Sequence, residues 1–186
     1  MTEYSPVVGD VVLVWGKAWT SRILGFVINK LFGVHSPPTH AEIVTGRVYD
    51  ISAEVEGVVL KPREKTFKES SRIMILRHKD MTDEKRRMLL SRVPIYKGKG
   101  YDFYNHARWY LIFTAVVSPL VYLVTDPLRK WLRRKSQTHW HCSELTAQLY
   151  RDIGIETGYE DFSFCPPHHF LHLARGSSDW EVVWEK

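Results

Sequence analysis

The chain has only two cysteines, Cys142 and Cys165, among its 186 residues. Two cysteines are too few for a disulfide scaffold, so the class of small disulfide-stapled domains is excluded, and either one bridge or two free thiols remains. The sequence also lacks internal repeats, low-complexity segments and an obvious interdomain linker. At this length we expect a single domain that spans residues 1–186.

Long apolar segments and a strong charge bias are missing as well. The longest uncharged stretch, residues 109–125, is interrupted by Ser118-Pro119 and is shorter than the roughly 20 residues that a membrane-spanning helix needs. We expect a buried helical hairpin there; the alternative is a membrane-surface element whose following basic run, "RKWLRRK", meets an anionic membrane or polymer. The net charge of +5 is mild and no nucleic-acid-binding motif is present, so no nucleic-acid partner is expected.

A secretion signal is not expected at the N-terminus either. The segment "MTEYSPVVGDVVLVWG" carries an early Glu3 and has no basic stretch leading into a long apolar run. The default expectation is therefore a cytoplasmic or virion-associated protein.

The hydrophobic pattern predicts strands mainly in the first half of the chain and helices mainly in the second. Strands are predicted at residues 10–15, in three short pieces between residues 40 and 62, at 72–78 and at 180–184. Helices are predicted at residues 19–32, 82–96, 101–124, 128–134, 142–154 and 166–174. This order indicates an α+β domain built on an antiparallel sheet.

Cys142 stands at the start of the helix predicted at residues 142–154, in the stretch "THWHCSELTAQLY". A thiol at a helix N-terminus faces unpaired backbone N–H groups and the positive end of the helix dipole, which both favour the thiolate. The same N–H groups can stabilise the oxyanion that forms when a carbonyl is attacked. The position therefore suits a nucleophile.

A cysteine nucleophile also needs a base that takes its proton. His139 and His141 are its neighbours in sequence, but a base usually approaches from another element of the fold. His40, in "PPTHAEIV", opens a predicted strand directly after a rigid proline loop. We therefore expect His40 to be the base.

Six segments then follow one another in a suggestive order: "GDVVLVW", "THAEIV", "SAEVEGVVLKP", "GKGYDF", "HCSELTAQLY" and "CPPHHFLHLA". Together they resemble the circularly permuted papain-like amidases, the permuted branch of the NlpC-type cysteine peptidases of bacteria and phages. The resemblance implies an antiparallel sheet or half-barrel packed against helices, Cys142 as nucleophile, His40 as base and Tyr101-Asp102 as a structural signature. It also implies hydrolysis of an amide, with cell-wall peptides as the commonest substrate class.

The third catalytic group departs from that family's pattern. Relatives often carry a glutamate twelve residues after the histidine, where this chain has Ser52 followed by Ala53. A serine can hydrogen-bond an imidazole but cannot stabilise an imidazolium ion as a carboxylate does. Asp50 and Glu54 share one face of the strand with Ser52, since strand side chains alternate. Glu54 is our preferred orienting group, with Ser52 and Asp50 as alternatives.

The cysteines and histidines of the chain also allow a second interpretation, a metal site. A zinc site could draw on a set of cysteines and histidines, but no second ligand pair has zinc-finger spacing, so neither a metal nor another cofactor is expected. The set comprises His139, His141, Cys142, Cys165, His168, His169 and His172. Trp140 and His168 are predicted to contact substrate.

The sequence thus predicts a cysteine hydrolase that cleaves an amide of cell-wall peptide or isopeptide type through a thioacyl intermediate. Two alternatives remain: a membrane-associated lipid acyltransferase or thioesterase, and a catalytically inactive homologue that binds a partner.

Overall fold

The computed structural model describes residues 5–102, 139–158 and 165–186. The apolar stretch at residues 109–125, the basic run after it and the helix predicted at residues 128–134 lie outside these ranges. The helix predicted from Tyr101 lies almost wholly outside them too, and Tyr101 itself belongs to a short strand, β6 (Gly100–Tyr101). Among the described residues, no helix is long and apolar enough to span a bilayer.

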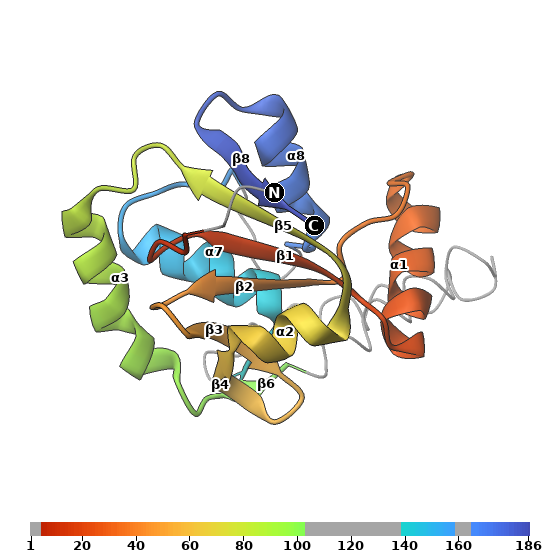
Figure 1. Cartoon of the computed structure of the whole chain (residues 1–186), viewed down its shortest axis with the longest axis horizontal. Helices are drawn as coiled ribbons and strands as arrows, with labels where there is room; N and C mark the ends of the chain where they lie inside the picture. Colours follow the sequence, from red (N-terminus) through yellow and green to blue (C-terminus); the bar gives the residue numbers. More distant parts are fainter. Residues whose placement is uncertain (1–4, 103–138, 159–164) are drawn as a thin grey trace, which may run out of the picture.

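A six-stranded open sheet forms the centre of the molecule (Figure 1). Its strands are β1 (Val11–Gly16), β2 (His40–Val44), β3 (Tyr49–Glu54), β4 (Gly57–Pro62), β5 (Ser70–His78) and β8 (Trp180–Glu185). They lie in the order β4-β3-β2-β1-β5-β8, and every neighbouring pair is antiparallel. The predicted α+β class with an antiparallel sheet is confirmed at this level.

The two faces of the sheet bury different apolar sets because side chains alternate along a strand. Val11, Leu13, Ala41 and Ile43 belong to the larger core, which also contains the inner face of α7 (Cys142–Asp152). On the other face, Val12 and Val14 pack with Val44, Ile73 and Ile75 beneath Phe67 and Trp184. In Figure 1, α7 lies behind the sheet and α2 (Arg63–Glu69) lies in front of it. The sheet is therefore covered on both sides near β2 and β3.

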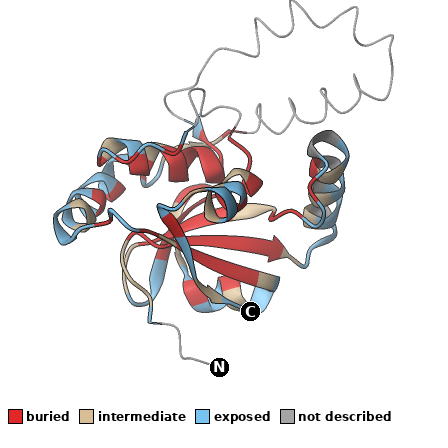
Figure 2. Cartoon of the chain, turned by 90° about the horizontal axis from the view of Figure 1, so that it is seen from above, coloured by how far each residue is buried: buried red, intermediate tan, exposed pale blue. Residues whose placement is uncertain are grey.

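The remaining helices surround this sheet. They are α1 (Trp19–Phe32), α3 (Asp83–Tyr96) and α8 (His168–Gly176). The α1 helix ends at Gly33, whose positive φ of 67° closes the last turn, and the Thr82 side chain caps the start of α3. Figure 2 shows buried residues concentrated in the sheet and α7, whereas the outer sides of α1 and α3 are exposed.

The structure contains three short elements that the sequence pattern did not predict. The seven-residue α2 begins directly after Pro62, and the two-residue strands β6 and β7 (His139–Trp140) pair in parallel. Elements of this length carry too few residues for a periodic hydrophobic pattern. Two of them adjoin the polar cluster described below: α2 contributes Thr66, and β7 leads into Cys142.

Candidate functional site

Cys142 is the first residue of α7 and is buried. Leu145 and Leu149 of the helix and Ile153 just after its end are buried in the main core, so they hold the helix against the sheet. The His141 side chain caps the helix by accepting from the Glu144 amide at 3.5 Å. The backbone N–H groups of the first turn have no carbonyl partner inside the helix, and Cys142 belongs to this turn.

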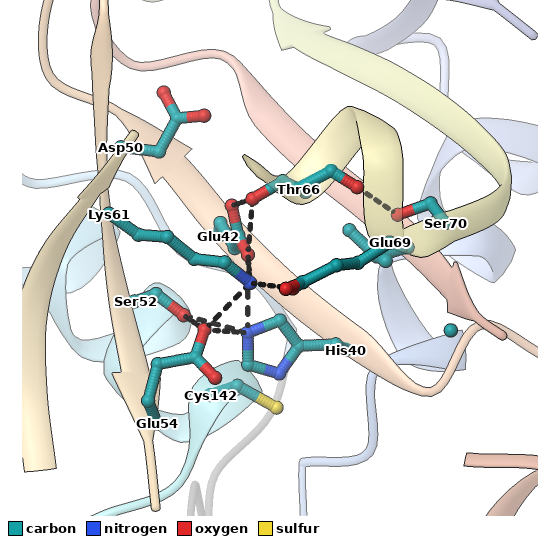
Figure 3. A network of polar contacts seen from close by, with 12 residues as sticks. His40, Glu42, Asp50, Ser52, Glu54, Lys61, Thr66, Glu69, Ser70 and Cys142 are labelled. Atoms are coloured by element: carbon teal, nitrogen blue, oxygen red, sulfur yellow. Dashed lines mark hydrogen bonds and ion pairs between the residues drawn. The ribbon is translucent and has the colours of Figure 1, made fainter. Parts of the chain in front are cut away.

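His40 opens β2, and Figure 3 shows its ring beside Cys142, with the edge that carries Nδ1 turned toward the sulfur. Burial raises the pKa of the Cys142 thiol, but the neighbouring His40 and His141 outweigh it and hold this pKa well below its usual range. Burial lowers the pKa of His40, and the contacts with Cys142, Glu42 and Glu54 outweigh it, so this pKa is well raised. Both shifts favour a thiolate–imidazolium pair.

Ser52 contacts the opposite edge of the imidazole. Its Oγ lies 2.7 Å from His40 Nε2 and donates to Glu54 Oε1 at 2.8 Å. A hydroxyl has a single hydrogen, so a serine that donates to Glu54 accepts from the Nε2–H of His40. The neutral ring then carries its proton on Nε2 and its lone pair on Nδ1, facing the thiol.

Glu54 lies directly behind this serine. Its Oε1 is 3.3 Å from His40 Nε2, close enough to interact with the imidazolium charge. Burial raises the pKa of Glu54, but His40, Lys61 and Ser52 outweigh it and hold this pKa well below the ordinary value. The structure thus brings both Glu54 and Ser52 to the histidine, and the catalytic role of Glu54 stays a prediction.

Asp50, the remaining alternative for the third group, is turned away from the histidine (Figure 3). Arg63 engages both of its carboxylate oxygens through Nε, at 3.1 and 3.0 Å, and Nη2 makes a further short contact. Burial raises the pKa of Asp50 to about 7 even though Arg63 opposes the shift. Asp50 therefore joins β3 to α2 and does not contact the imidazole.

Glu42 and Lys61 belong to the same cluster, and the sequence reasoning missed both. Glu42 is fully buried, its Oε1 lies 3.4 Å from His40 Nε2, and Thr66 Oγ1 donates to its Oε2 at 3.0 Å. Lys61 Nζ lies 3.3 Å from Glu42 Oε1 and 3.1 Å from Glu54 Oε1. The sequence did contain a signal for Glu42. Side chains alternate along a strand, so Glu42 shares a face with His40, two residues earlier, while Ala41 between them points into the core.

The two residues predicted to contact substrate both lie in packed surroundings. The Trp140 ring is buried and meets Tyr96 edge-on, with ring centroids 5.2 Å apart. His168 is buried beside His172, and burial together with its histidine neighbours lowers the pKa of His168 to about 4. Their contact with substrate stays a prediction.

Cys165 provides a contrast within the same chain. It is a free, fully buried thiol whose pKa is raised, chiefly by burial and then by the charges of Cys142 and Glu144. No disulfide joins it to Cys142. The pKa values of the two thiols are thus shifted in opposite directions, and the lowered one belongs to Cys142 at the helix start.

The cysteines and histidines considered as an alternative zinc site do not form a cluster of metal-type donors in the described part of the chain. There, the group of three or more metal-type donors that come close together is His40, Glu42 and Glu54, whose donor atoms lie within 4.8 Å of one another. This group shares none of its members with the histidines and cysteines considered for zinc.

A cavity of about 300 Å³ lies beside the start of β2, between α1, the end of β1 and the loop before His40. Thr39 forms part of its wall, next to the catalytic histidine candidate in sequence. Lys17, Arg22 and Asn29 add polar groups, and Trp15 and Phe26 add apolar surface. The cavity thus has a mixed lining with two basic side chains.

Comparison with known proteins gives a fold and no family. No family model matches the chain, and no curated protein matches it either. Among solved structures, it is similar to the crystal structure of the metalloprotein yiiX from Escherichia coli O157:H7, described as DUF1105. The TM-score is 0.57 at 19% sequence identity, over 96% of this chain and 89% of that one, so the likeness concerns the fold alone.

These findings correct the family assignment made from the sequence. The assignment to the NlpC-type permuted papain-like amidases is wrong: no family model matches the chain, and a solved structure of similar fold is described as a DUF1105 metalloprotein. The physical reason is that each motif was short. A Gly-Asp turn, a histidine at a strand start and a cysteine at a helix start are local solutions that unrelated sequences reach independently.

Proposed function

We propose that this protein is a cysteine hydrolase that cleaves an amide through a thioacyl intermediate on Cys142. The observation that supports this most is the placement of His40 between Cys142 on one edge of the ring and Ser52 with Glu54 on the other. It combines an acidic thiol, a base in the required tautomer and a carboxylate behind that base.

The proposed reaction has two stages. The Cys142 thiolate attacks the carbonyl carbon, and the first-turn N–H groups of α7 stabilise the oxyanion. When the C–N bond breaks, His40 gives its Nδ1 proton to the leaving amine, and a thioester remains on Cys142. His40 then takes a proton from water, which attacks the thioester and releases a carboxylic acid and the free thiolate.

The proposed substrates are cell-wall peptides or isopeptides. Thr39, which precedes His40 in sequence, lines the cavity described above. The cavity has room for part of a substrate, and its Lys17 and Arg22 suit an acidic group such as a peptide carboxylate.

The test is capture of the intermediate. Wild-type protein, Cys142→Ser and Cys165→Ser are incubated with peptide amides, isopeptides and activated esters and analysed by intact mass. We expect an acyl group on wild type and Cys165→Ser and none on Cys142→Ser. If no substrate acylates Cys142 and a mild electrophile does not label it at neutral pH, the hydrolase proposal fails and an inactive binding protein is favoured.

A lipid-directed acyltransferase or thioesterase is the second candidate, supported by α1. Trp19 is 71% exposed and Phe26 is 56% exposed on this helix, and Ile23 is exposed as well. Lys30 lies over the Phe26 ring, 5.7 Å from its centroid, so basic and apolar groups adjoin as they do in membrane-surface helices. Acylation of Cys142 by a vesicle-borne lipid ester, and not by soluble amides, would favour this candidate.

The solved neighbour's description as a metalloprotein raises the question of a metal in this chain. His40, Glu42 and Glu54 have suitable donor atoms, but Lys61 Nζ already contacts the Oε1 atoms of both glutamates. A divalent ion at the roughly 2.0–2.2 Å that metal–carboxylate bonds require would be repelled by this ammonium group. The residues do not fit a metal while Lys61 is in place.

The permuted papain-like arrangement stays a prediction of fold detail. The histidine strand precedes the cysteine helix along the chain, and that order is consistent with such an arrangement.

A further inference from the structure

Lys61 lies at the centre of the polar cluster and extends from β4 across β3 (Figure 3). Its Nζ is 3.1 Å from Glu54 Oε1, 3.3 Å from Glu42 Oε1 and 3.7 Å from Glu69 Oε2. Its side chain is only 12% exposed, whereas the Glu42 side chain is fully buried. One ammonium group therefore faces three carboxylates, one of which has no access to water.

Such an arrangement needs a cation. A buried carboxylate is costly unless an opposite charge accompanies it, and here two carboxylates approach the same imidazole nitrogen. Glu42 Oε1 and Glu54 Oε1 lie 3.4 and 3.3 Å from His40 Nε2. When the His40 ring is neutral, the Lys61 ammonium group is the positive charge that offsets the repulsion between the two glutamates.

We infer that Lys61 is the resident cation of this cluster, where it holds Glu42 and Glu54 beside His40 and excludes a divalent metal ion from the same oxygens. The three donor atoms lie close enough together to hold an ion, so the chain has the parts of a metal site. The ammonium group of Lys61 supplies the positive charge that a bound metal ion would otherwise supply.

This exclusion has a chemical consequence, which rests on the proposed function. A metal on His40 needs the lone pair of Nε2, because that nitrogen faces the two glutamates. The proton of the neutral ring would then move to Nδ1, the nitrogen turned toward Cys142 (Figure 3). A ring with Nδ1–H cannot accept the thiol proton. Lys61 is thus a positioning residue that preserves the tautomer through Ser52 and Glu54.

The experiment is a Zn²⁺ titration by calorimetry, with every protein built on Cys142→Ala so that the thiol cannot bind zinc. Lys61→Met is compared with Lys65→Met, a matched control at an exposed lysine on α2. We expect Lys61→Met to bind one Zn²⁺ at least about a hundredfold more tightly than the parent or Lys65→Met. Adding Glu42→Gln to Lys61→Met should abolish that binding.

A second readout reports the tautomer. In protein labelled with ¹⁵N-histidine and held at a pH where the His40 ring is neutral, the parent should show the Nε2–H form, and zinc should convert it to the Nδ1–H form in Lys61→Met only.

Two results would overturn the inference. One is a parent protein that binds Zn²⁺ stoichiometrically and loses it on Glu42→Gln, a measurement that does not require Lys61→Met to fold. The other is a folded Lys61→Met, judged by circular dichroism, that binds no more zinc than its control. Neither depends on acylation of Cys142, so failure here and failure of the hydrolase proposal are separate outcomes.

Discussion

At the scale of single residues, Ser52 occupies the position where related hydrolases were expected to carry the third catalytic group, and it lies between Glu54 and His40. Ser52 donates to Glu54 and lies 2.7 Å from His40 Nε2, so it connects a carboxylate to the imidazole. A direct approach also exists, because Glu54 Oε1 is 3.3 Å from the same nitrogen. The carboxylate that can stabilise an imidazolium ion and the hydroxyl that selects the Nε2–H tautomer of the neutral ring therefore belong to different residues.

Alkylation of Cys142 should report its lowered pKa. Because His40 and His141 overcome the effect of burial, the thiolate persists as the pH falls below the usual thiol range of about 8.5, and iodoacetamide should still react near pH 6. His40→Ala removes one of the two histidines that oppose the effect of burial, so the pKa of Cys142 rises. The alkylation rate at pH 6 then falls at least about tenfold. Mass spectrometry of the pH–rate profile measures this, with Cys165→Ser as the unchanged control.

Substitutions of Ser52 and Glu54 should separate the effect of the hydroxyl from the effect of the carboxylate. Ser52→Ala keeps the Glu54 charge near His40, and we expect turnover to fall about tenfold. Glu54→Gln removes that charge, and we expect a loss of about a hundredfold or more. Steady-state kinetics across pH measure both changes. Equal losses in the two variants would contradict this division of roles.

At the scale of elements, the polar cluster depends on α2 being fixed to the sheet. Arg63, the first residue of α2, binds the Asp50 carboxylate on β3 and donates to the carbonyl oxygens of Arg47 and Gly46. From the same helix, Thr66 donates to Glu42. A helix of seven residues is not stable alone, so these contacts hold it in place.

Breaking this clamp should destabilise the protein strongly. Arg63→Met leaves the Asp50 carboxyl buried without its partner, and we expect the free energy of unfolding to fall by about 3–5 kcal/mol. Urea denaturation followed by circular dichroism measures the loss. Adding Asp50→Asn should recover part of it, because the buried charge is then absent, whereas Lys65→Met on the same helix should change stability by less than about 0.5 kcal/mol.

The sequence predicted the regular elements better than the contacts between them. Apolar runs or periods identify most of the strands and helices α1 and α7 without tertiary information, and the capping residue Thr82 with the acidic first turn identifies α3. The approach of Lys61 to Glu42 depends on strand pairing and on α2, and neither is encoded in a local pattern. Cys142 and His40 could be selected because a helix start and a strand start are visible in the sequence. Glu42 and Lys61 become recognisable as site residues only when tertiary packing brings them together.

At the scale of the whole molecule, a net charge of +5 accompanies exposed aromatic side chains on one helix, α1. We predict that the protein floats with vesicles that contain anionic lipid and that flotation weakens between about 0.05 and 0.5 M salt, because screening shortens electrostatic attraction. Combined Trp19→Ala and Phe26→Ala substitutions should reduce flotation further. Tyr49→Ala, at an exposed aromatic on β3, is the control. Equal binding to neutral vesicles would contradict an electrostatic contribution.

The pairing of β3 has a consequence for how this protein tolerates insertions and deletions. Ser52 and Glu54 alternate with Ile51 and Ala53, which belong to the main core. A slip of β3 by one residue would send the apolar pair to the histidine and the polar pair into the core. Chemistry and folding are therefore encoded in the same alternation. A one-residue deletion in the turn at residues 45–48 should abolish both together. A two-residue insertion preserves the phase of β3, so it should cost only the contacts of Arg63 with the carbonyl oxygens of this turn.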